Sequence, residues 1–148
     1  MKFELTLCNC FWLLIPLLLW NVSLGPQLID PKIISDTHSP KWLLLAENFT
    51  RILVFLLPLL IPLRIDSVLK KSGLVIYIIG TLFYFFSWLP LLFAPESGWS
   101  QSTAGLLAPR LTPLLPFLGI GLLGSNWLYG GISILFIILH TWHGVQNL

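Results

Sequence analysis

The chain has 148 residues, of which 56% are apolar and only 9% are charged, with a net charge of +2. A soluble domain of average composition is about 45–50% apolar and about 25% charged, so a water-soluble globular fold is close to excluded. A disordered chain, a coiled coil and a basic nucleic-acid-binding protein are excluded as well, because each needs many charged residues.

Apolar runs long enough to cross a bilayer follow one another along the chain. About 20 mostly apolar residues are needed to cross roughly 30 Å of hydrocarbon. The runs predict an all-α, polytopic transmembrane helical bundle in which short loops make sequential helices antiparallel neighbours. One integral membrane domain, residues 1–148, would contain five spans: residues 5–24, 42–63, 73–93, 106–123 and 127–143.

The first run also has features of a secretory signal peptide. Lys2 precedes an apolar core, and Ser23-Leu24-Gly25 supplies small residues at a cleavage position. The apolar stretch is long for a signal peptide, however, and Trp20 and Asn21 fit poorly before a cleavage site. We therefore expect an uncleaved first span.

The last apolar stretch, residues 106–143, is too long for one crossing. Gly124-Ser125-Asn126 has the composition of a turn and divides it in two. Pro109, Pro113 and Pro116 in the first half predict either a broken helix or a re-entrant segment. Five spans are favoured, and four spans with 106–123 re-entrant are the alternative.

Residues at the ends of the runs indicate how the chain sits in a membrane. Short cytoplasmic loops are rich in Lys and Arg, and the loop at 64–72 contains Arg64, Lys70 and Lys71. This pattern favours a cytoplasmic N-terminus in a plasma or inner membrane. Tryptophans near the run ends predict a belt at the membrane interfaces: Trp20, Trp42, Trp88, Trp127 and Trp142.

A polar stripe interrupts the second run. The apolar residues after Arg51, residues 52–63, are too few to span a bilayer, so Glu47 and Arg51 are expected inside it. The two are spaced i,i+4 with Glu first, the favourable order for a helical ion pair, and Asn48 lies beside them. Intramembrane charges are costly, so the stripe is expected to face the bundle interior as a structural pair or as a binding site.

Two histidines near the end of the chain, His140 and His143, form the second candidate site. Their i,i+3 spacing puts both on one helix face, where they could bind a metal or relay protons. Five spans would bring them to the same membrane face as Glu47, and His₂Glu is a known zinc ligand set. The pattern H-x-x-H is weak by itself. We therefore expect no cofactor, with a metal at His140 and His143 as the alternative.

The segment Gly119 to Gly124 matches the pattern G-x-G-x-x-G of dinucleotide-binding proteins. That motif also needs a preceding strand and an acidic residue about 20 positions later, and no Asp or Glu follows Glu96. Small residues that let helices approach closely explain the pattern better. No nucleotide partner is expected.

The sequence does not point to a named activity. We expect a small multi-pass membrane protein with a non-enzymatic role as a scaffold, subunit or accessory protein, in contact with lipid and with copies of itself or other membrane subunits. One alternative is a transporter of a small solute, a proton or an ion. A second is a membrane-embedded, metal-dependent enzyme at the outer face, with Glu47 as third ligand or general base.

Overall fold

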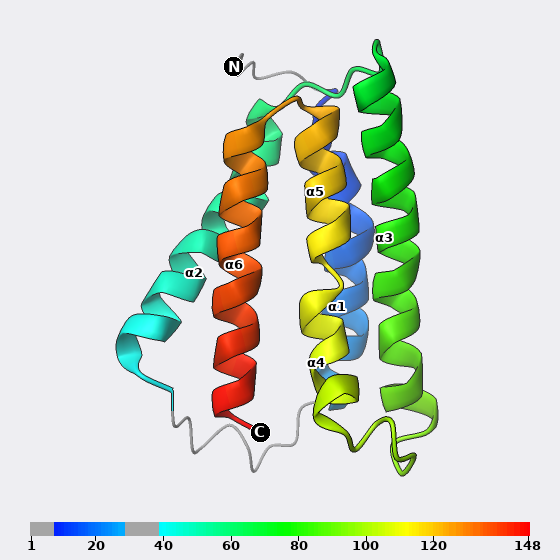
Figure 1. The fold of residues 1–148 in the computed structure, drawn as a ribbon, viewed down its shortest axis with the longest axis vertical. Helices are drawn as coiled ribbons and strands as arrows, with labels where there is room; N and C mark the ends of the chain where they lie inside the picture. Colours follow the sequence, from blue (N-terminus) through cyan, green and yellow to red (C-terminus); the bar gives the residue numbers. More distant parts are fainter. Residues whose placement is uncertain (1–7, 29–38) are drawn as a thin grey trace.

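The computed structural model describes residues 8–28 and 39–148, which form an all-α bundle (Figure 1). The described part contains five helical units long and apolar enough to cross a membrane, which confirms the predicted fold class. The units are η1 (Cys10–Leu14) with α1 (Ile15–Leu28), α2 (Lys41–Leu56) with η3 (Leu57–Leu60), α3 (Val68–Phe93), α4 (Thr103–Leu111) with α5 (Leu114–Leu123), and α6 (Trp127–Gln146).

The first helical unit and α3 extend furthest beyond their predicted bounds. The first continues to Leu28 through Pro26 instead of ending at 24, while the predicted residues 5–7 lie outside the described part. α3 begins at Val68 instead of 73, because the Ser67 side chain caps its first turn by accepting from the Lys70 amide. Lys70 is therefore helical, and its hydrogen bond to Asp66 holds the pKa of that carboxyl below its usual value.

The proline-rich fourth span is a broken helix. α4 ends at Leu111 and α5 starts at Leu114, on either side of Thr112 and Pro113. The two pieces continue in the same direction from one end of the bundle to the other (Figure 1). The re-entrant alternative with four spans is therefore wrong. At the break, the hydroxyls of Ser87 and Thr112 lie 3.1 Å apart and connect α3 to this unit.

α3 and α5 form the most extensive helix pair, and glycines allow their close approach. A Cβ atom on Gly119 would lie 2.6 Å from the Tyr77 backbone nitrogen and 2.8 Å from the Gly73 carbonyl oxygen. Backbone therefore contacts backbone here, as in small-residue interfaces of membrane helices. The interpretation of the glycine motif as a packing feature is confirmed at Gly119.

α2 packs mainly on α6 and not on α3, although α3 follows it in the chain. Figure 1 shows α6 and α5 between α2 and α3. The expectation that sequential helices are neighbours is thus wrong for this pair. The physical reason lies in the sequence of α5 and α6, which supply the glycine surface for α3 and the polar partners for α2.

The predicted tryptophan belt is wrong in part. Trp88 is buried in the core, and Trp20 stacks on Phe85 with ring centroids 4.3 Å apart. Trp127 is exposed at the start of α6. Trp42 and Trp142 are also exposed, and they contact each other where α2 begins and α6 ends.

Candidate functional site: a polar clasp between two helices

The side chain of Glu47 is the centre of the site and is only 1% exposed. Its carboxylate contacts Arg51, one turn further along α2, and both histidines of α6. His140 Nδ1 lies 2.9 Å from Oε1, and His143 Nδ1 bonds to Oε2. An ionised carboxylate can only accept, so each imidazole donates its Nδ1–H. We call these four residues the clasp.

The backbone geometry of α2 and α6 creates the clasp. Glu47 lies on the buried face of α2 with Leu43, Thr50 and Val54, a spacing of three or four residues that follows the helical turn. α2 begins at the bundle end where α6 finishes, so Glu47 meets the last turns of α6 (Figure 1). At the same end, Asn147 Nδ2 donates to Ser39 Oγ over 3.1 Å.

The structure therefore brings together four of the five candidate residues. Asn48 is the exception, because it lies beside the clasp, half-buried, and makes no hydrogen bond with any described residue. Its position 100° around the helix from Glu47 turns it away from α6.

Arg110, near the end of α4, belongs to the site and is missed by the sequence analysis. Its guanidinium lies against Gly144, where a Cβ would overlap it, and its charge is within electrostatic reach of Glu47. Within residues 8–28 and 39–148 it has no ion-pair partner. The sequence does contain a signal for Arg110, because it is an ionisable residue inside an apolar run. The same criterion identified Arg51.

The donor set gives no support to a metal centre. No group of three or more His, Cys, Asp or Glu side chains in the described part has the arrangement of a metal site. Each imidazole Nδ1 atom hydrogen-bonds directly to one of the Glu47 carboxylate oxygens. These nitrogen and oxygen atoms are therefore not available as metal ligands in this arrangement. Metal binding by His140 and His143 stays a prediction.

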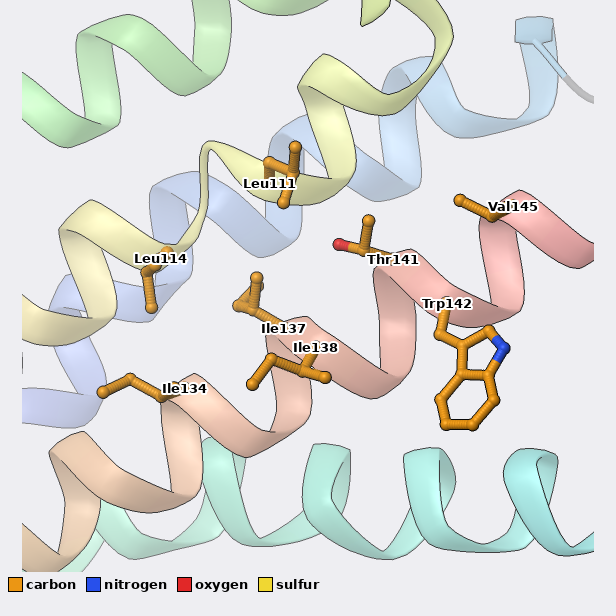
Figure 2. Close-up of a pocket in the computed structure, with 8 residues that line it drawn as sticks. All are labelled: Leu111, Leu114, Ile134, Ile137, Ile138, Thr141, Trp142 and Val145. Carbon is orange, nitrogen blue, oxygen red and sulfur yellow. The ribbon is translucent and has the colours of Figure 1, made fainter. Parts of the chain in front are cut away.

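Two cavities are lined in part by α6, the helix that carries both histidines of the clasp. One is an apolar groove of about 470 Å³ between α4–α5 and α6, where Thr141 is the only polar lining residue (Figure 2). The other, of about 330 Å³, lies between all five helical units and has Arg51 and His140 in its wall. We call it the central cavity.

The fold and the clasp define a small integral membrane protein built from five helices of membrane-spanning length. No protein-family model, curated protein or solved structure matches the chain.

Proposed function

We propose that the protein is a non-enzymatic membrane scaffold or subunit in which the clasp fixes α2 against α6. The observation that carries this proposal is that both oxygens of the Glu47 carboxylate accept hydrogen bonds. Its oxygens accept from Arg51, His140 and His143, and the side chain is closed to solvent. A group held this way is a poor general base and a good connector.

The clasp also supports a role in presenting a surface. α2 has few other contacts with the bundle, so its position depends on α6. Its opposite face exposes Leu45, Phe49 and Ile52 to lipid or to another membrane protein, including a second copy of the chain. Arg64, Lys70 and Lys71 lie at the other end of the bundle, which favours a plasma or inner membrane with the N-terminus cytoplasmic and the clasp near the outer face.

Transport of a small solute, a proton or an ion is the second candidate function. The central cavity favours it, because Arg51 and His140 line a space inside the bundle. Charged groups that line such spaces often mark transport pathways.

Proton flux distinguishes the scaffold from a proton transporter. Purified protein in vesicles containing a pH-sensitive dye should conduct no more than protein-free vesicles do, because Glu47 is held by three donors. Glu47→Gln should leave this background unchanged. Flux through the wild-type protein that is lost in a folded Glu47→Gln protein would overturn the scaffold and establish transport.

A further inference from the structure

The central cavity has a polar end and an apolar end. α1 and α6 finish at the bundle end where α2 begins (Figure 1). On each of these three helices, a polar lining residue lies one turn closer to that end than an apolar lining residue does. The polar residues are Asn21, His140 and Arg51. Those apolar residues are Leu17 on α1, Phe136 on α6 and Phe55 on α2.

An aromatic wall continues from the polar end into the bundle. The ring of Phe136 stacks on His140 with centroids 5.4 Å apart. Phe117 contacts Phe136 at 6.2 Å and Phe55 at 6.4 Å. A contiguous aromatic surface of this kind binds apolar chains and excludes water.

Positive charge exceeds negative charge at the polar end. Glu47 is the one carboxylate of the clasp, whereas Arg51 and Arg110 are both nearby. The Arg51 side chain is 41% exposed, and only one of its five N–H donors, on Nη2, has a partner within the described part of the chain. Half-exposed guanidinium donors inside a bilayer are costly unless an anion accepts from them.

We propose that the central cavity binds an anionic amphiphile, with the acidic head at Arg51 and the apolar chain along Phe55, Phe117 and Phe136. The cavity volume is at the lower end of the range of about 300–1,000 Å³ for ligand sites, so it suits a single chain better than two. A carboxylate of a long-chain fatty acid and a phosphate of a phospholipid share this chemistry. The site goes beyond the scaffold function and does not require it.

Photolabelling tests the site in the full-length protein. A palmitate analogue with a mid-chain diazirine, added to protein in phosphatidylcholine nanodiscs, should label peptides that contain Phe55, Phe117 or Phe136. Unlabelled palmitate should compete at least about tenfold better than hexadecanol, because a charge-assisted hydrogen bond contributes about 1.5–3 kcal/mol. Phosphatidic acid forms a second arm: stronger competition by this lipid than by palmitate identifies the phospholipid source.

Variants locate the head and the chain separately. Arg51→Gln should weaken labelling at least about tenfold, and Lys71→Gln, which removes a charge at the other end of the bundle, should not. Leu18→Trp keeps the clasp and should reduce labelling by narrowing the cavity. Equal competition by palmitate and hexadecanol, or labelling spread over the lipid-facing surface, would overturn the proposal. This result is independent of the flux measurement.

Discussion

Glu47→Leu should destabilise the protein by about 3 kcal/mol, the cost of leaving several hydrogen-bond donors without their acceptor. The substitution leaves Arg51 without its carboxylate and leaves His140 and His143 without an acceptor. α2 would then separate from α6, since it has few other contacts with the bundle. The thermal unfolding midpoint in one detergent measures the effect.

Asn48→Leu is the matched control for this substitution. It also replaces a polar side chain with leucine, one residue further along α2, but it removes no hydrogen bond within the described part. We expect its midpoint to stay close to that of the wild-type protein, within about 0.5 kcal/mol. Equal midpoints for Glu47→Leu and Asn48→Leu would contradict a structural role for the clasp.

Gly119→Leu should have the second large effect, at or above the upper end of the range of about 1–3 kcal/mol for overpacking. Its Cβ would meet backbone atoms of Gly73 and Tyr77, which no rotamer change can move away. α3 and α5 would have to separate, and they form the most extensive helix pair of the bundle. Thermal unfolding in detergent again gives the measurement.

Gly131→Leu provides the comparison. A Cβ at Gly131, in α6, has no atom within 4 Å, so the larger side chain has space. Leucine is also a better helix former than glycine by about 0.8 kcal/mol. The midpoint of this variant should therefore stay the same or rise. If Gly119→Leu behaved in the same way, the close contact between α3 and α5 would be refuted.

The apolar runs predicted the membrane helices because length and hydropathy are local properties of the chain. The helix ends were less accurate, since the start of α3 depends on the cap at Ser67 and on Asp66, and neither is apolar. Local sequence patterns did not predict which helices pack against each other. α2 contacts α6 because Glu47 bonds to His140 and His143, which are more than 90 residues away in the sequence. A rule that pairs helices adjacent in the sequence does not take such distant partners into account.

Four of the five polar residues that the sequence singled out lie together in the clasp. Glu47 and Arg51 were identified by the cost of charge in hydrocarbon, and the two histidines by their shared helix face. Arg110 was not predicted, because it lies near the start of the predicted span 106–123, where a long basic side chain can reach the membrane interface. The central cavity depends on side chains from every helical unit, so no single stretch of sequence contains its signature.

Crosslinking of α2 to α6 tests the clasp most directly. Trp42→Cys and Trp142→Cys would introduce the crosslinking pair, because the two tryptophan rings are 5.4 Å apart beside the clasp. Cys8→Ser and Cys10→Ala would remove the two native thiols. Two differently tagged versions, expressed together and treated in membranes with a short bifunctional maleimide, separate links within a chain from links between chains. The structure predicts a link within one chain whose yield falls when Glu47→Leu is added. Links only between chains, or a yield unaffected by Glu47→Leu, would contradict it.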